Sequence, residues 1–230
     1  MNNAFIVIAA YNEEKRIHRV IASLKNAGYH NIIIVDDGSK DRTCEHATNT
    51  GAIVLRHILN RGQGASLKTG IDYSLLCGAE IIVTFDADGQ HRVEDLPAMI
   101  KPVANGKVDI TAGSRFLRKT KVPFVRKILL KGSILVIWIF YGIKMTDAHN
   151  GFRAMSRKAA QRINITCDRM AHASEIIEEI HKKKLRCLEI PVKILYTKET
   201  LKKGRGSYLG AIKVFARMIS KKLLGGIMND

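Results

Sequence analysis

Two aspartates, Asp86 and Asp88, stand two residues apart directly after the apolar run Ile81 to Phe85, and Gln90 follows them. Carboxylate and amide oxygens are hard ligands of the kind that Mg²⁺ or Mn²⁺ binds, and such a cation can carry a diphosphate. The alternative is that the acidic residues only cap a helix that begins near Val93. The spacing Asp-x-Asp does not by itself choose between a metal site and a helix cap.

Polar side chains also follow two earlier apolar runs. Tyr11-Asn12-Glu13 follows Ala4 to Ala10, and Asp36-Asp37-Gly38-Ser39 follows Asn31 to Val35, although the latter could be a simple tight turn. Ligands of parallel sheets bind beyond the carboxyl ends of the strands, so we expect the three strand ends to form one site. Burying several unpaired carboxylates together is costly unless a cation or ligand is present, which favours a binding site over independent caps.

The elements that must position these residues alternate in type along the first half of the chain. Short apolar runs predict strands, and apolar residues at helical spacing predict helices between them. Such alternation is typical of an α/β fold with a mostly parallel central sheet flanked by helices. The predicted strands are Ala4–Ala10, Asn31–Val35, Ala52–Arg56 and Ile81–Phe85, and the predicted helices are Glu13–Ala27, Asp41–Asn49 (with Asp41 as a possible N-cap) and Gln63–Leu76.

The alternation becomes less regular after Lys107, and the second half carries most of the positive charge. The 230 residues and a hydrophobic content of 46% are compatible with one domain over 1–230. In the second half we predict strands at Val108–Ala112 and Leu188–Ile194 and helices at Phe124–Tyr141 and Ser174–Lys183.

The formal net charge is +17, from 38 Lys and Arg against 21 Asp and Glu. Such a charge attracts nucleic acid, anionic lipid or phosphorylated small molecules. We expect no nucleic-acid partner, because the chain has no recognised binding motif, only 6% aromatic residues, and acidic strand ends that this function would leave unexplained. The four cysteines are scattered, which predicts neither disulfides nor a zinc site and fits a cytoplasmic protein.

Two segments bear on membranes. The longest apolar stretch, Ser133 to Ile143, is about half of the ~20 residues that cross a bilayer, so any attachment should be peripheral, on the inner face of the membrane. The segment Tyr208 to Leu224 has an apolar stripe with Lys and Arg between and opposite, which predicts a basic amphipathic helix. That helix could lie on an anionic membrane or dock on the domain.

Seven segments, in order, resemble those of glycosyltransferase family 2, whose enzymes have the GT-A nucleotide-sugar-binding fold. They are AAYNEE from Ala9, VDDGSKD from Val35, NRGQGASLKTG from Asn60, FDADGQH from Phe85, GSRF from Gly113, DAHNGFRAMSR from Asp147 and HASEI from His172. The nearest group is the dolichyl- or polyprenyl-phosphate sugar synthases, whose DxDxQ pattern matches Asp86, Asp88 and Gln90. The resemblance implies inverting transfer of a sugar from a UDP- or GDP-linked donor to a lipid phosphate, with Mg²⁺ or Mn²⁺ held by those three residues.

By the same resemblance, residues 1–107 form the donor-binding half and residues 108–230 the acceptor-binding half. The glycine-rich segment from Asn60 lacks the ending of a P-loop, and we expect its backbone to lie near the nucleotide. The implied donor-binding residues are Ala9, Tyr11, Glu13, Val35, Asp36, Asp37, Asp86 and Ala87, together with Lys203, Arg205 and Ser207 in a loop that would close over the diphosphate.

The second half must stabilise the departing diphosphate and bind the acceptor. Arginine and a cation stabilise charge that develops on a leaving group, so Arg115 joins Asp88 among the predicted catalytic residues. The resemblance directs Arg115 and Arg126 toward an acceptor phosphate, and we add Arg153 to this set.

Glu175 occupies the place of the carboxylate base in inverting relatives that use a sugar hydroxyl as acceptor. A saccharide or other hydroxyl acceptor, with Glu175 as catalytic base, is therefore the alternative to a lipid phosphate. A lipid phosphate is already anionic, and with that acceptor Glu175 would only position or orient. We expect His149 and His172 to make structural hydrogen bonds rather than transfer protons.

Overall fold

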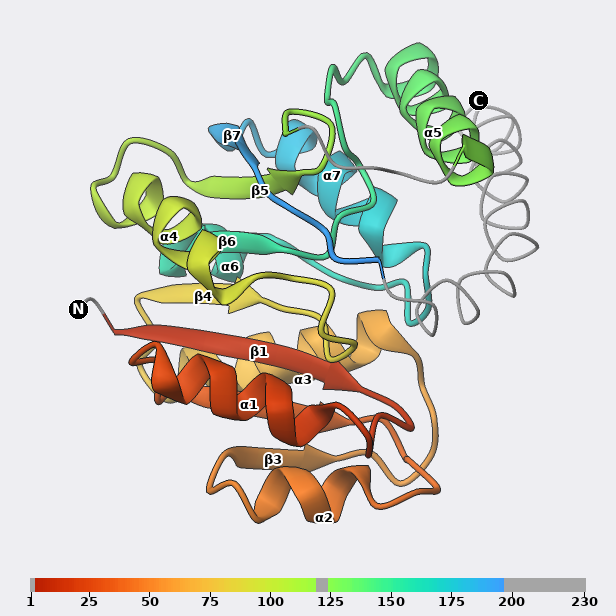
Figure 1. Cartoon of the computed structure of the whole chain (residues 1–230). Helices are drawn as coiled ribbons and strands as arrows, with labels where there is room; N and C mark the ends of the chain where they lie inside the picture. Colours follow the sequence, from red (N-terminus) through yellow and green to blue (C-terminus); the bar gives the residue numbers. More distant parts are fainter. Residues whose placement is uncertain (1–2, 119–123, 197–230) are drawn as a thin grey trace, which may run out of the picture.

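The computed structural model describes residues 3–118 and 124–196, whose seven strands form one sheet in the order β3-β2-β1-β4-β6-β5-β7 (Figure 1). Of these described strands, β6 alone runs against its neighbours, pairing antiparallel with β4 and β5, so the prediction of a mostly parallel sheet is confirmed. The strands are β1 (Ala4–Ala10), β2 (Ile32–Asp36), β3 (Ile53–Arg56), β4 (Ile81–Thr84), β5 (Ile110–Ser114), β6 (Arg153–Ser156) and β7 (Cys187–Pro191).

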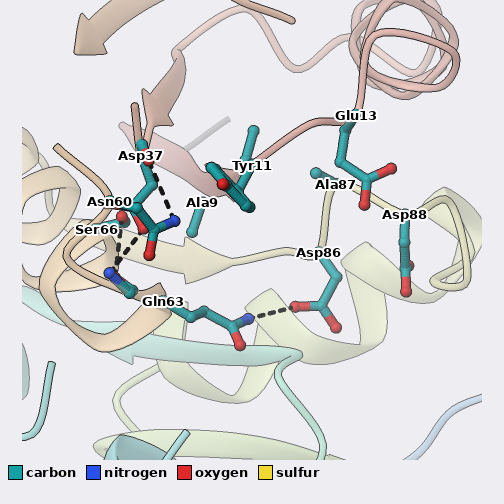
Figure 2. Close-up of a pocket in the computed structure, with 12 residues that line it drawn as sticks. Ala9, Tyr11, Glu13, Asp37, Asn60, Gln63, Ser66, Asp86, Ala87 and Asp88 are labelled. Carbon is teal, nitrogen blue, oxygen red and sulfur yellow. Dashed lines mark hydrogen bonds between the residues drawn. The ribbon is translucent and has the colours of Figure 1, made fainter. Parts of the chain in front are cut away.

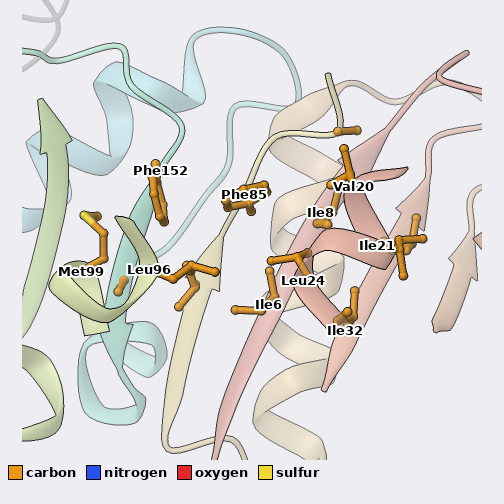
Figure 3. Close-up of a cluster of buried hydrophobic side chains, with 14 of the residues drawn as sticks. Ile6, Ile8, Val20, Ile21, Leu24, Ile32, Phe85, Leu96, Met99 and Phe152 are labelled. Carbon is orange, nitrogen blue, oxygen red and sulfur yellow. The ribbon is translucent and has the colours of Figure 1, made fainter. Parts of the chain in front are cut away.

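Helices cover both faces of the sheet, because successive strand residues point to opposite sides. On β1, Ile6 and Ile8 pack in the cluster with α1 and α4 (Figure 3), whereas Phe5 and Val7 pack in the cluster with α3, α6 and α7. The helices are α1 (Ile17–Asn26), α2 (Thr43–Thr48), α3 (Gln63–Leu76), the 3-10 turn η1 (Val93–Asp95), α4 (Leu96–Ala104), α5 (Phe124–Tyr141), α6 (Arg157–Arg162) and α7 (His172–Lys182).

Helix α5 lies at one end of the molecule, next to α7 (Figure 1). Its Ile134 packs with Ile177 of α7 and with Ala148. In the described part of the chain, no helix is both long enough and apolar enough to cross a bilayer.

The sequence did not predict β6 and α6. Strand β6 is only four residues long and opens with the buried Arg153, so it lacks the apolar run by which the other strands are recognised. Its residues are nevertheless central, because β6 joins the four parallel strands of the first half to β5 and β7.

Several element boundaries differ from prediction. Helix α1 begins at Ile17 rather than Glu13, because Asn12 has a φ of 54° and the Glu13 carbonyl accepts the amides of Arg16 and Ile17 in a turn. Arg42 takes the N-cap place of α2, while the Asp41 carboxylate accepts the Thr43 amide at 3.0 Å.

Similar shifts affect the second half. Strand β7 ends at Pro191, and Ile194 makes only an isolated bridge to His91. The expected helix near Val93 is a 3-10 turn that leads into α4. The predicted helix Tyr208–Leu224 lies outside the described residues.

The parallel register places the carboxyl ends of three strands at one edge of the sheet. Ala10 pairs with Asp36 across β1 and β2, and Val7 pairs with Thr84 across β1 and β4. The residues that follow these strands are therefore neighbours, as the sequence predicted.

Helix α3 approaches the sheet through Gly70. An added Cβ there would lie 2.4 Å from Val7 Cγ1 and 3.1 Å from Val35 Cγ2. We predict that Gly70→Ala lowers the free energy of unfolding by about 1–3 kcal/mol through overpacking. The matched change Gly132→Ala, in α5 where an added Cβ meets nothing within 4 Å, should raise it by about 0.5–1 kcal/mol. Urea denaturation measures the free energy of unfolding of both variants. Equal changes in the two variants would contradict the packing argument.

Candidate functional site

A cavity of about 360 Å³ lies at the shared sheet edge, between the ends of β1, β2 and β4 and the start of α3 (Figure 2). Most of the predicted donor-binding residues in the described part of the chain line it. They are Ala9, Tyr11, Glu13, Asp37, Asp86 and Ala87, and the predicted metal ligand Asp88 joins them.

Asp37 is held rigidly in this cavity. Its Oδ1 accepts the Arg61 amide at 2.9 Å and lies 2.8 Å from His57 Nδ1, and its Oδ2 accepts the Gly62 amide at 2.7 Å. Burial raises the pKa of Asp37, but the hydrogen bonds from His57 and the two amides outweigh it and lower the pKa below its usual value. The carboxylate is therefore a fixed, ionised hydrogen-bond acceptor.

Asp86 is also compensated by its surroundings. His91 Nε2 lies 2.7 Å from Asp86 Oδ2, and Gln63 Nε2 donates to Oδ1 at 3.3 Å. Burial raises the pKa of Asp86, but His91 and the positive charge of Arg153 lower it by more. Asp86 is consequently ionised at neutral pH.

The ring of His91 is fixed by two phenylalanines. Its centroid lies 5.3 Å from that of Phe85 and 5.1 Å from that of Phe152, distances typical of favourable aromatic contacts. Gly151 packs directly against the Asp86 carboxylate, because a Cβ at this position would lie 2.6 Å from Oδ1. The orientation of the Asp86 carboxylate is thus set by packing as well as by hydrogen bonds.

Asp88 lacks comparable compensation. Its oxygens accept the backbone amide and the side-chain Nε2 of Gln90, at 3.0 and 2.8 Å. Burial, followed by the negative charge of Asp86, raises the pKa of Asp88 to about 6. Two carboxylates that repel each other in one cavity form a donor set that a hard divalent cation would stabilise, so the residues fit Mg²⁺ or Mn²⁺.

The third predicted ligand, Gln90, is placed as a hydrogen-bond partner of Asp88 and does not line the cavity. Within residues 3–118 and 124–196, no three His, Cys, Asp or Glu side chains converge into a metal-binding group. A cation on Asp86 and Asp88 would therefore take further ligands from phosphate or water, as Mg²⁺ commonly does.

Two predicted donor residues lie outside the cavity. The Val35 side chain is buried in the core against α3. Asp36 is fully buried, where it accepts the Ser39 amide at 3.3 Å and its Oδ2 lies 3.3 Å from Arg56 Nε. Both side chains pack at the end of β2 and are not part of the cavity lining.

The predicted arginines occupy different surroundings. Arg115 is buried, and its Nε donates to Asp147 Oδ2 at 2.6 Å. Arg153 is buried at the start of β6, close enough to Asp86 to affect its pKa, and its Nη1 has no hydrogen-bond partner within residues 3–118 and 124–196. Arg126 belongs to α5. The structure brings neither Arg115 nor Arg153 into the lining of the cavity.

Glu175 lies in the first turn of α7 and does not line the cavity. Its carboxylate accepts the amides of Thr166 and Cys167 at 3.0 and 2.9 Å, and the Thr166 hydroxyl as well. His172 is buried, with Nδ1 2.9 Å from the Arg169 carbonyl oxygen.

Burial lowers the pKa of both His149 and His172 to about 4, so both rings are neutral near pH 7. The predicted loop residues Lys203, Arg205 and Ser207 lie outside the described residues.

Sequence reasoning did not assign the side chains of Asn60, Gln63 and Ser66, which line the cavity, or His57, which contacts Asp37. The sequence carried a signal for the first three, because the glycine-rich segment was expected near the nucleotide. His57 follows directly after β3, so the strand-end argument could also have found it.

Comparison with known proteins identifies relatives over nearly the whole chain. A sequence model of the family described as glycosyl transferase family 2 matches residues 5–163. The chain is 33% identical over 241 residues to the UDP-N-acetylglucosamine--dolichyl-phosphate N-acetylglucosaminyltransferase of Methanococcus voltae, covering 95% of this chain and 96% of the relative. It is also 40% identical to an uncharacterized protein of Methanocaldococcus jannaschii, covering 95% and 92% of the two chains.

The fold has a solved counterpart. The glucosyl-3-phosphoglycerate synthase of Mycobacterium tuberculosis, crystallised with Mn²⁺, UDP and phosphoglyceric acid, matches with a TM-score of 0.74. The two share 16% sequence identity, and the match covers 96% of this chain and 78% of the synthase. The fold and the family expected from the sequence motifs are therefore confirmed.

The buried His172 gives the fold a defined pH dependence. In the unfolded chain a histidine has a pKa of about 6.5, so between pH 6.5 and 4 the unfolded state binds a proton that the native state does not. Stability should accordingly fall as the pH falls through this window, by up to about 3 kcal/mol from His172. Urea unfolding of the wild type and of His172→Gln at several pH values checks this. The free energy of unfolding of the variant should fall less steeply between pH 6.5 and 4 than that of the wild type. An equally steep fall would contradict the assignment to His172.

Proposed function

Because this chain belongs to glycosyltransferase family 2, we propose that it transfers a sugar, with inversion, from a nucleoside-diphosphate sugar to a dolichyl or polyprenyl phosphate at a membrane surface. The observation that supports this most is the cavity that gathers Asp37, Asp86 and Asp88 at one sheet edge. We assign the nucleotide to the half formed by residues 1–107 and the acceptor to residues 108–230.

The cavity suits a nucleotide at one end and a diphosphate at the other. Asp37 is an immobile ionised acceptor for hydroxyl or base N–H groups. The ring of Tyr11 is 41% exposed at the cavity and can contact the base. Glu13, which lines the same cavity, completes the nucleotide contacts expected from the family.

We assign Mg²⁺ or Mn²⁺ to Asp86 and Asp88. The cation would supply the positive charge that binds the donor diphosphate and stabilises it as it departs. Asp86, ionised and fixed by His91 and Gln63, and Asp88, held by Gln90, provide the carboxylate oxygens. The solved synthase, which was crystallised with Mn²⁺ and UDP, supports this type of ligand.

A lipid phosphate is the acceptor that the residues favour. A phosphate is already anionic at neutral pH, so its attack needs no general base, whereas a sugar hydroxyl does. The one carboxylate in the expected base position, that of Glu175, is engaged by three hydrogen bonds from the preceding segment. The name of the Methanococcus voltae relative, which includes dolichyl phosphate, agrees with this choice.

We propose that Arg115, Arg126 and Arg153, with Lys203 and Arg205, supply positive charge to the acceptor and diphosphate sites, and that Ser207 contributes to donor binding. Arg115 is anchored by Asp147, and Tyr196 OH lies 3.3 Å from its Nη1. An arginine held in this way keeps a fixed orientation when phosphate approaches.

Helix α5 offers a surface for the membrane. Ile128, Leu135, Trp138 and Ile139 are large apolar side chains that are about half exposed or more, and Lys127 and Lys131 are exposed on the same helix. Apolar side chains beside lysines on one helix are typical of binding in the interface of an anionic bilayer. We propose anionic lipid headgroups as the partner of this surface.

The metal assignment predicts that Asp88→Asn abolishes the Mn²⁺-dependent rise in melting temperature with UDP or GDP. In the wild type, a nucleotide at a hundred times its Kd should add about 2.7 kcal/mol of stability. Sugar transfer to polyprenyl phosphate should fall by at least about a hundredfold. The control Asp72→Asn, at an exposed ion pair with Lys68, should change neither measurement. A variant at position 88 that kept the manganese effect would refute the assignment.

The membrane assignment predicts that the double change Lys127→Glu and Lys131→Glu weakens binding to vesicles containing anionic lipid by at least tenfold. Each lysine near such a surface contributes about 1 kcal/mol. Co-sedimentation with phosphatidylglycerol vesicles measures the effect, and Lys107→Glu, at an exposed turn after α4, is the control. Equal binding of the double variant and the control would show that α5 does not face the lipid.

A further inference from the structure

The carboxylate of Glu175 connects helix α7 to the segment that precedes it. Glu175 Oε2 accepts the amides of Thr166 and Cys167, at 3.0 and 2.9 Å, and Oε1 accepts the Thr166 hydroxyl. Oε2 thus fixes the backbone of residues 166–167, and Oε1 holds the Thr166 side chain. Hydrogen bonds from backbone amides to an ionised carboxylate are among the stronger ones in proteins.

The backbone that Glu175 fixes continues into direct contact with the start of α3. Ala65 N donates to the Asp168 carbonyl oxygen at 3.1 Å. A Cβ at Gly62 would lie 2.5 Å from that same oxygen, and a Cβ at Gly64 would lie 2.0 Å from the Cys167 carbonyl oxygen. The two segments therefore touch backbone to backbone, and no side chain larger than hydrogen fits between them. Movement of residues 167–168 must move the start of α3.

The start of α3 in turn holds two carboxylates of the cavity. The amides of Arg61 and Gly62 donate to Asp37, and the side chain of Gln63 donates to Asp86. Figure 2 shows the last contact, with Gln63 reaching from α3 toward Asp86. These residues precede or begin the helix, directly beside the glycines that residues 167–168 contact.

We propose that Glu175 is a positioning residue for the donor pocket, acting through residues 166–168 and the Gly62–Gly64 turn on Asp37 and Asp86. The inference rests on the proposed function, because it assigns these two carboxylates to donor binding. In this proposal Glu175 contributes to nucleotide binding and does not act as a proton acceptor. Loss of its carboxylate leaves the amides of Thr166 and Cys167 without this acceptor. Residues 167–168 are then held less firmly against Gly62 and Gly64 at the start of α3.

The two roles of Glu175 differ in what they change. A positioning residue sets the Kd of the nucleotide and the KM of the donor sugar, and it leaves the pH profile of kcat as it is. A catalytic base sets kcat and its pH profile, and it leaves nucleotide binding unchanged. Direct measurement of UDP and GDP binding in the presence of Mn²⁺ therefore separates the two roles without an acceptor.

The test compares three variants with the wild type by isothermal titration calorimetry with UDP or GDP and Mn²⁺. Glu175→Ala should raise the Kd at least tenfold. Thr166→Val, at an exposed position, removes only the hydroxyl donor and should raise the Kd by a smaller factor of about two to five. Glu179→Ala is the matched control, because Glu179 lies one turn further along α7 and accepts the Asn164 amide at 3.1 Å and the Lys183 ammonium at 2.6 Å. It should bind the nucleotide like the wild type.

Thermal unfolding without ligand identifies the temperature at which all variants are folded, and binding is measured there. A Glu175→Ala or Thr166→Val variant that binds nucleotide as the wild type does would overturn the inference. So would a Glu175→Gln enzyme whose kcat falls a hundredfold at unchanged Kd, since that result indicates a base. Failure of the wild type to bind either nucleotide would reject the proposed donor itself, and the inference with it.

Discussion

Repulsion among carboxylates is the constraint on which this sheet edge depends. Parallel strands deliver Asp37, Asp86 and Asp88 to one cavity, and each negative charge there must be balanced. Backbone amides and His57 balance Asp37, while His91 and Arg153 balance Asp86. Among the described residues, Asp88 accepts two hydrogen bonds from Gln90, and burial and the charge of Asp86 nevertheless raise its pKa to about 6. The uncompensated negative charge of Asp88 lies in the cavity, where a cation carrying a diphosphate would balance it.

One of the balancing groups, Arg153, comes from a distant part of the chain, and the antiparallel strand places it. Strand β6 inserts between β4 and β5 and brings the buried Arg153 close to Asp86. The turn before it places Gly151 against the Asp86 carboxylate. The first half of the chain thus provides the acidic side chains together with His91, and the second half adds the charge of Arg153, which lowers the pKa of Asp86 further.

The first four strands could be predicted because their apolar runs are continuous and the residues after them are polar. The same argument predicted that Tyr11, Glu13, Asp37 and Asp86 would meet, since the meeting of strand ends follows from parallel pairing. Strand β6 was not predicted because it begins with an arginine, a residue that is rarely buried. Here the groups that balance the charge of this arginine come near it only in the folded chain.

Contacts between segments far apart in the sequence set the rest of the site. Residues 167–168 lie against Gly62 and Gly64, on either side of Gln63, whose side chain donates to Asp86. Likewise, the pairing of Arg115 with Asp147, which fixes the arginine within the protein, cannot be read from two separate motifs. The recognised motifs contain Gln63, Arg115 and Asp147, but only the three-dimensional packing shows what each one touches.

The single reversed strand also determines where this architecture can vary. Phe152 and Ala154 pack with the helices on one face of the sheet and Met155 with those on the other, so Arg153 faces Met155's side. Insertion of a single residue between 150 and 153 would reverse this alternation relative to the preceding turn and move the arginine away from Asp86. An insertion between β5 and residue 150 leaves that alternation intact. The segment between β5 and residue 150 can therefore differ in length without disturbing the surroundings of Asp86, provided that the residues entering β6 keep their alternation between the two faces.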